Sequence, residues 1–136
     1  MFVDASAIVA ILTGEDEAEL LAAALDRSEA SMTSPIAVWE AAASISRKTG
    51  GKAAAELPDI VEFLAIAGTT IEPVAMPETA AALDAFDRYG RRSGHPADLN
   101  TGDCFAYAFA ATRRIALLYK GKDFAETDLG HIAAKF

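Results

Sequence analysis

The alternation of short apolar runs with longer amphipathic segments is the feature that most constrains the fold of this chain. Runs that predict strands lie at 1–3, 30–33, 69–74 and 115–119, and helical patterns fill most of the sequence between them. Such alternation is typical of an α/β domain whose mainly parallel sheet is flanked by helices. A length of 136 residues predicts one domain, spanning residues 1–136.

Glycine, proline and capping residues mark where the expected helices begin and end. Ser6 is expected to cap a first helix that Gly14 ends, and Ser34 and Pro35 begin a helix that stops at Gly50. Further helices are expected over 15–27, 52–68 and 77–92. The apolar side chains assigned to the buried faces of these helices include Leu20, Trp39, Leu57, Val61, Leu83, Phe86, Phe105 and Phe109.

The stretch 99–112 carries the clearest helix start in the chain. Asn100 or Thr101 can cap with a side-chain oxygen, and Asp103 then falls in the first turn, where a carboxylate suits the exposed N–H groups. An acid in a first turn usually does no more than stabilise its helix. Asp103 by itself is therefore weak evidence of chemistry.

Four acids at comparable places in the pattern make a stronger case together. Asp4 and Asp123 follow expected strands, whereas Glu40 and Asp103 lie near expected helix starts. Strand ends and the starts of the following helices share one edge of a parallel sheet, where ligands bind. Clustered carboxylates repel one another unless a cation offsets their charge. Oxygen ligands of this kind suit Mg²⁺, with Mn²⁺ possible, and no cluster of Cys and His predicts zinc.

Composition limits the class of protein further. The formal net charge of −8 argues against a nucleic-acid partner, although Arg47, Lys48 and Lys52, and also Arg88, Arg91 and Arg92, form local basic groups. Cys104 is the only cysteine, which fits a reducing, cytoplasmic setting. We expect no membrane span and no signal peptide. His95 and His131 are interpreted as a loop and a tail residue, not as metal ligands.

Four stretches resemble the PIN-domain proteins, and more closely the VapC-type toxins of bacterial toxin–antitoxin pairs. They are the opening residues 1–8 with Asp4, residues 38–42 with Glu40, residues 95–108 with Asp103 and residues 117–124 with Asp123. Ala5 stands where the family usually has Thr or Ser, and Lys122 where it often has Asp or Asn. The stretch 95–108 is the most specific match.

This resemblance implies a PIN-like fold and an Mg²⁺-dependent endoribonuclease that cleaves structured RNA, tRNA or rRNA, by metal-activated water. Asp4 and Asp103 are then primary metal ligands, Glu40 and Asp123 complete the site, and Ser6 orients Asp4 or a water. The resemblance also implies a homodimer and a VapB-type antitoxin that occludes the cleft. Contact with DNA is then only indirect, through the antitoxin.

Two other functions are weighed against the nuclease. A phosphoacceptor of the haloacid-dehalogenase type requires a second Asp at the position of Ser6. A receiver domain requires an Asp after a middle strand, where this chain has Val74 and Ala75. The other alternative is a catalytically silent PIN-like binding module that acts through its antitoxin partner. The presence of all four acids disfavours a silent site.

Overall fold

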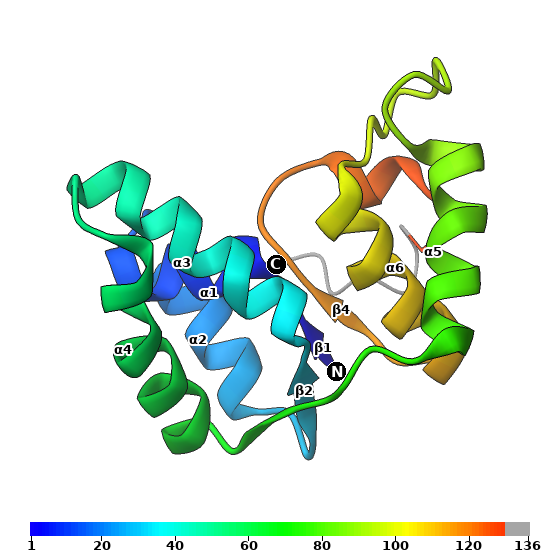
Figure 1. Cartoon of the computed structure of the whole chain (residues 1–136). Coiled ribbons are helices and arrows are strands. Elements are labelled where there is room, and N and C mark those ends of the chain that lie inside the picture. Colours follow the sequence, from blue (N-terminus) through cyan, green and yellow to red (C-terminus); the bar gives the residue numbers. More distant parts are fainter. Residues whose placement is uncertain (130–136) are drawn as a thin grey trace.

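The computed structural model describes residues 1–129, in which strands alternate with helices around one parallel sheet (Figure 1). The elements in chain order are β1 (Phe2–Val3), α1 (Ala5–Thr13), α2 (Ala18–Asp26), β2 (Ser31–Thr33), α3 (Pro35–Thr49), α4 (Ala53–Ile66), β3 (Thr69–Ile71), α5 (Met76–Tyr89), α6 (Thr101–Arg113), β4 (Leu117–Leu118) and a 3₁₀ helix (Asp123–Glu126). His131 and the tail that ends at Phe136 lie outside the described residues.

The sheet has the order β3-β2-β1-β4, and all of its strand pairs are parallel. This confirms the α/β class and the parallel sheet. All four strands are shorter than the apolar runs predict, and two differ most: the run at 115–119 forms only β4, and the run at 69–74 forms only β3 before Pro73, which has no N–H to continue the ladder. The short strands leave room for loops at the edge where Asp4 follows β1.

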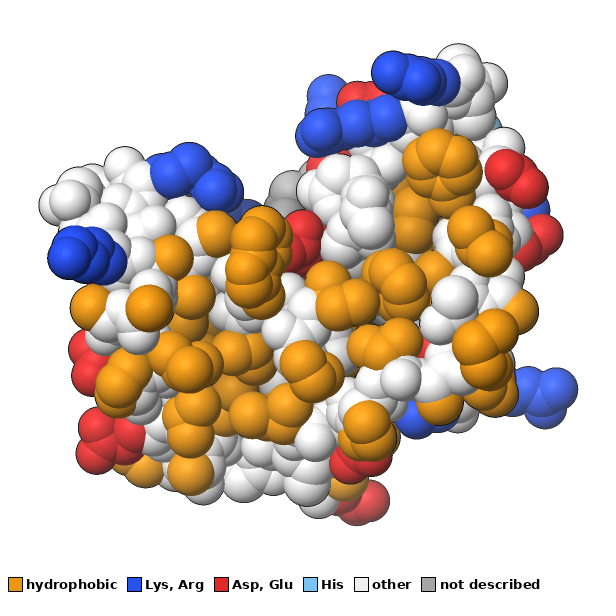
Figure 2. Space-filling view, viewed as in Figure 1, with side chains coloured by type: hydrophobic (Ala, Val, Ile, Leu, Met, Phe, Trp, Pro, Cys, Tyr) orange, Lys and Arg blue, Asp and Glu red, His pale blue; other side chains and the backbone are white. Residues whose placement is uncertain are grey.

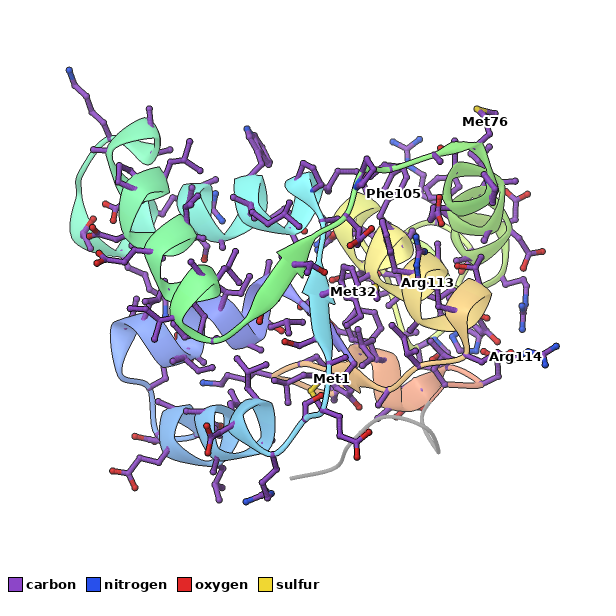
Figure 3. The ribbon with its side chains drawn as sticks, turned by 90° about the horizontal axis from the view of Figure 1, so that it is seen from below. Met1, Met32, Met76, Phe105, Arg113 and Arg114 are labelled. Carbon is purple, nitrogen blue, oxygen red and sulfur yellow. The ribbon has the colours of Figure 1, made fainter. Side chains whose placement is uncertain are left out.

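The helices lie in two groups on either side of the sheet, α1–α4 on one side and α5 with α6 on the other (Figures 1 and 3). The core joins the groups through β1: the ring of Phe2 stacks on that of Phe109 in α6, with the ring centroids 4.9 Å apart. Phe109 is fully buried, as expected, and Cys104 is nearly so, whereas Phe105 is only half-buried.

Several apolar side chains that the periodicity assigns to the core are instead exposed. Leu20 is 56% exposed and Trp39 is 71% exposed, while their neighbours Leu21 and Val38 are buried. Adjacent residues on a helix point about 100° apart, so a helix packed along one narrow stripe leaves the next position in water. The same correction applies to Leu57, Val61, Leu83 and Phe86.

Two helix starts also differ from expectation. Asp4, not Ser6, is the N-cap of α1, since its carboxylate accepts a hydrogen bond from the Ser6 backbone N–H. Helix α2 begins at Ala18 and not at Glu15, because the Glu15 N–H bonds back to the Ala10 carbonyl and its side chain is held elsewhere. Helix α5 likewise stops at Tyr89, short of Arg92.

Within residues 1–129, no helix combines the length and the apolar character needed to cross a membrane.

The stacked pair Phe2–Phe109 gives a stability prediction. Phe109→Ala removes a fully buried ring and is expected to lower the free energy of unfolding by about 3–5 kcal/mol. Phe86→Ala is the matched control, since Phe86 is 45% exposed on α5, and it should cost about 1 kcal/mol or less. Urea denaturation followed by circular dichroism measures both, and equal losses would show that α6 does not anchor the core.

Candidate active site

A cavity of about 390 Å³ opens at the edge of the sheet where β1 ends. Three of the four predicted acids line it: Asp4, Glu40 and Asp103. They come from the end of β1, from α3 and from the start of α6. The fold therefore brings together carboxylates that are separated by 36 to 99 positions along the chain. Figure 2 shows acidic atoms in the notch between the two groups of helices, with basic side chains on both sides.

Asp4 is held rigidly at the base of this cavity. Its side chain is nearly buried, and Oδ2 accepts hydrogen bonds from the Ser6 backbone N–H (2.9 Å) and from Ser6 Oγ (2.5 Å). Ser6 Oγ in turn accepts the backbone N–H of Lys120 at 3.0 Å, which ties the chain beyond β4 to the same point. The expectation that Ser6 orients Asp4 agrees with these contacts.

Asp103 is fixed by the start of α6. Its Oδ2 accepts the backbone N–H of Asn100 at 2.8 Å, and Asn100 Oδ1 accepts the backbone N–H of Asp103 at 3.0 Å. This reciprocal capping box decides between the two predicted caps in favour of Asn100. It also sets the Asp103 carboxylate at the helix terminus that carries partial positive charge.

Glu40 reaches the cavity because α6 has a glycine where α3 crosses it. A Cβ atom on Gly102 would lie 1.8–2.1 Å from the carboxylate atoms of Glu40, so only a hydrogen fits there. Glycine inside a helix costs about 1 kcal/mol relative to alanine. Sequence reasoning missed Gly102, although a glycine in the first turn of an otherwise good helix was the available signal.

Asp123 stands apart from the other three acids. It is exposed at the start of the 3₁₀ helix, follows β4 through an intervening loop and does not line the cavity. Its negative charge nevertheless raises the pKa of both Asp4 and Asp103, so it lies at the rim of the site. Within residues 1–129, no three His, Cys, Asp or Glu side chains converge closely enough to hold an ion by direct bonds alone.

The pKa values of all three cavity acids are raised. Burial is the main cause for each: it raises the pKa of Glu40 to about 7 and that of Asp103 to about 7, and it raises that of Asp4 as well. The charge of Asp4 adds to the rise for the other two. Three ionised carboxylates in this cavity are therefore unfavourable by themselves, and a bound cation would offset their charge.

Glu15 closes one end of the cavity, a role that the sequence did not indicate. It is the first residue of the helix predicted over 15–27, but in the structure its carboxylate pairs with Lys48 from α3 and Lys120 from beyond β4. These contacts lower the pKa of Glu15 to about 2. Lys120 also contacts Glu17 at 2.8 Å. Of the basic residues noted in the sequence, Lys48 is therefore neutralised at this end.

Comparison with known proteins identifies the arrangement. The sequence model of the PIN domain matches residues 1–129. A VapC ribonuclease of Rhizobium meliloti is 43% identical over 143 aligned positions, which cover 95% of this chain and 99% of that protein. Ribonuclease VapC28 of Mycobacterium tuberculosis is 39% identical, with 93% of each chain covered. The chain belongs to the PIN domain family, among the VapC ribonucleases. This confirms the resemblance stated from the sequence.

A solved structure of the family has the same fold. The crystal structure of VapC20 of Mycobacterium tuberculosis, described as a sarcin–ricin loop cleaving toxin, aligns with a TM-score of 0.69 at 19% identity. The alignment covers 91% of this chain and 92% of that one. At this level of identity the likeness supports the PIN fold found here.

The donor set of this PIN domain fits a hard divalent cation. PIN-domain nucleases in general depend on a divalent metal ion, and every acid named above offers oxygen ligands. Because the acids do not converge to direct bonding distance of one ion, the fit is to a cation that keeps several of its waters. Gly102 leaves space for the carboxylate of Glu40 in the cavity, and the raised pKa of that carboxylate shows that its negative charge is not offset by the protein alone. Both features fit a site that binds a cation.

The raised pKa values predict how the metal-free VapC domain responds to pH. Acids whose pKa is raised by folding stabilise the protein fully below their unfolded values, and this stability is lost as pH rises through about 7 for Glu40 and Asp103. With a chelator present, the Tm should therefore fall by several degrees between about pH 5 and about pH 8. The double variant Glu40→Gln with Asp103→Asn should show a flatter profile, and a wild-type Tm that rises over this range would contradict the assignment.

The close contact between Gly102 and the carboxylate of Glu40 predicts a variant that folds but loses ribonuclease activity. Gly102→Ala improves helix propensity by about 1 kcal/mol, and the carboxylate of Glu40 must move away from the new methyl group. We expect an unchanged or higher Tm and at least a tenfold loss of ribonuclease activity. Adding Glu40→Gln should cost little more, because both changes remove the same group. Independent, multiplying losses would show that Gly102 acts otherwise.

Proposed function

We propose that this chain is the toxin of a VapB–VapC-type pair, an Mg²⁺-dependent endoribonuclease whose ion is held by Asp4, Glu40, Asp103 and Asp123, with Mn²⁺ as the other candidate. The observation that carries the proposal is the cavity that gathers three mutually repelling carboxylates at the end of β1. When bound, the ion activates water and stabilises charge at the scissile phosphodiester.

Hydrogen bonds within the chain orient two of the carboxylates without a bound ion. Ser6 holds one oxygen of Asp4, and Asn100 holds one oxygen of Asp103, so both carboxylates present fixed orientations. We propose these two as the primary ligands. Glu40, set against Gly102, and Asp123, at the rim, complete the set directly or through water.

The proposed substrate is structured RNA, with tRNA and rRNA as the candidate classes. VapC20, which has the same fold, is described as a toxin that cleaves the sarcin–ricin loop of RNA. The chain's net charge of −8 does not favour RNA, but Arg47, which makes no ion pair within residues 1–129, lines the same cavity as the acids. Phosphates can therefore approach at the basic edge of the cavity.

The proposed partners follow from the same family. VapC proteins imply a VapB antitoxin, and we propose that it controls this chain and provides the only link to DNA. We also propose a homodimer, which would help to bury exposed apolar side chains of α5 such as Met76 and Leu83. The silent binding module proposed as the alternative has no specific observation in its favour.

Cleavage assays on the purified chain test the enzyme. Asp103→Asn should lower the rate of RNA cleavage in Mg²⁺ by about 10²-fold or more, because it removes a negative charge from the cavity. Asp87→Asn is the matched control: Asp87 is exposed on α5 and does not line the cavity, so its cleavage rate should be unchanged. Sequencing of new RNA 5′ ends identifies the target.

Metal binding provides a second readout in the same preparations. Millimolar Mg²⁺ or Mn²⁺ should raise the Tm of the wild type, because an ion that binds only the folded state stabilises it. Asp4→Ala combined with Asp103→Ala should abolish this rise. Equal cleavage by wild type and Asp103→Asn would overturn the enzyme assignment, and a metal-induced rise that survives the double change would overturn the ligand set.

A further inference from the structure

A second cavity, of about 300 Å³, adjoins the carboxylate cavity. Its lining includes Trp39, Glu40, Arg47, Arg91, Asn100 and Thr101. Glu40, Arg47 and Asn100 also line the cavity that holds the three acids, so these residues are shared between two adjoining cavities. Whatever occupies the second cavity therefore lies directly beside the proposed catalytic acids.

Trp39 is the distinctive side chain of this second cavity. It is the only tryptophan in the chain, and it is 71% exposed although it sits on α3 directly before Glu40. Within residues 1–129, no aromatic ring stacks on it and no cation lies over it. An indole that is largely exposed to water beside a polar cavity is accessible to a ligand.

Two arginines from different parts of the fold line the same cavity. Arg47 comes from the last turn of α3, and Arg91 comes from the loop after α5, where its backbone N–H bonds to the Leu99 carbonyl at 3.0 Å. Arg47 makes no ion pair within the described residues, and Arg91 only approaches the exposed Asp98 at 3.9 Å. Arg88, by contrast, is engaged with Asp84 and Asp128.

We propose that this cavity is a nucleobase subsite, in which Trp39 stacks on an unpaired base of the RNA next to the cleavage position while Arg47 and Arg91 bind the flanking phosphates. This inference rests on the proposed ribonuclease function and narrows its substrate class. Aromatic stacking and arginine contacts are the usual means of binding unstacked RNA bases.

The charges around the cavity favour a base there over a phosphate. Glu40 lies in its wall, and a phosphate next to that carboxylate would be repelled, whereas an uncharged base is not. The phosphates on either side of the base then meet Arg47 and Arg91 instead. A base in a duplex cannot reach the indole without unpairing, so the subsite selects loops and single strands.

Direct binding assays test the subsite without cleavage. In EDTA, a short single-stranded oligoribonucleotide should quench the emission of Trp39 to saturation, and a blunt RNA duplex of the same sequence should not. By anisotropy of the labelled single strand, Trp39→Ala should bind about tenfold more weakly and Trp39→Phe should recover most of the affinity. Phe86→Ala, which changes another exposed aromatic residue on α5, should bind as the wild type does.

The arginines have their own matched control. Arg47→Gln and Arg91→Gln should each weaken binding and lower the slope of log affinity against log salt by about one. Arg92→Gln changes the neighbouring exposed arginine, which does not line the cavity, and should leave that slope unchanged.

The outcomes separate this inference from the proposed function. Unquenched Trp39 emission, or equal affinity of Trp39→Ala and wild type, overturns the subsite even where RNA is cleaved. Emission that changes with protein concentration and not with RNA also overturns it, and assigns Trp39 to contact with a second copy of the chain. Quenching by RNA in a protein that shows no cleavage supports the subsite and contradicts the proposed ribonuclease function.

Discussion

Repulsion among carboxylates at one edge of the sheet is the constraint on which the rest of this structure depends. Asp4, Glu40 and Asp103 are each partly or wholly removed from water, and burial together with repulsion from a neighbouring carboxylate raises their pKa values. The surrounding structure supplies what opposes this cost. Ser6 and Asn100 donate to two of the acids, and Gly102 leaves the third the space it needs. A cation would complete the balance.

Chain order and local capping made much of this predictable. The apolar runs and the signals at Ser34, Pro35 and Asn100 predicted the parallel sheet and several helix starts, because these features act over a few residues. Asp4, Glu40 and Asp103 could be placed together because strand ends and helix starts share an edge in this fold. The ligand roles of these acids and of Asp123 remain predictions.

What the sequence did not predict depends on contacts between distant segments. The exposure of Trp39 and Leu20 follows from how narrow the packed stripe of each helix is, which periodicity alone does not reveal. Gly102 matters only because Glu40, 62 positions earlier, packs against it. Glu15 looked like one acid among several until the fold placed Lys48 and Lys120 beside it. Each of these is a tertiary effect that overrides the local pattern.

The distribution of charge on the surface explains how a chain with a net negative charge can bind RNA. Glu15 neutralises the two lysines at one end of the carboxylate cavity, whereas Arg47 and Arg91, beside Trp39, keep their charge available. Positive charge is therefore concentrated on one side of the acids, and the net charge says little about that side. An RNA strand that approaches there meets arginines and an indole before it meets carboxylates. In the proposed subsite its phosphates then bind the two arginines, and an unpaired base stacks on the indole.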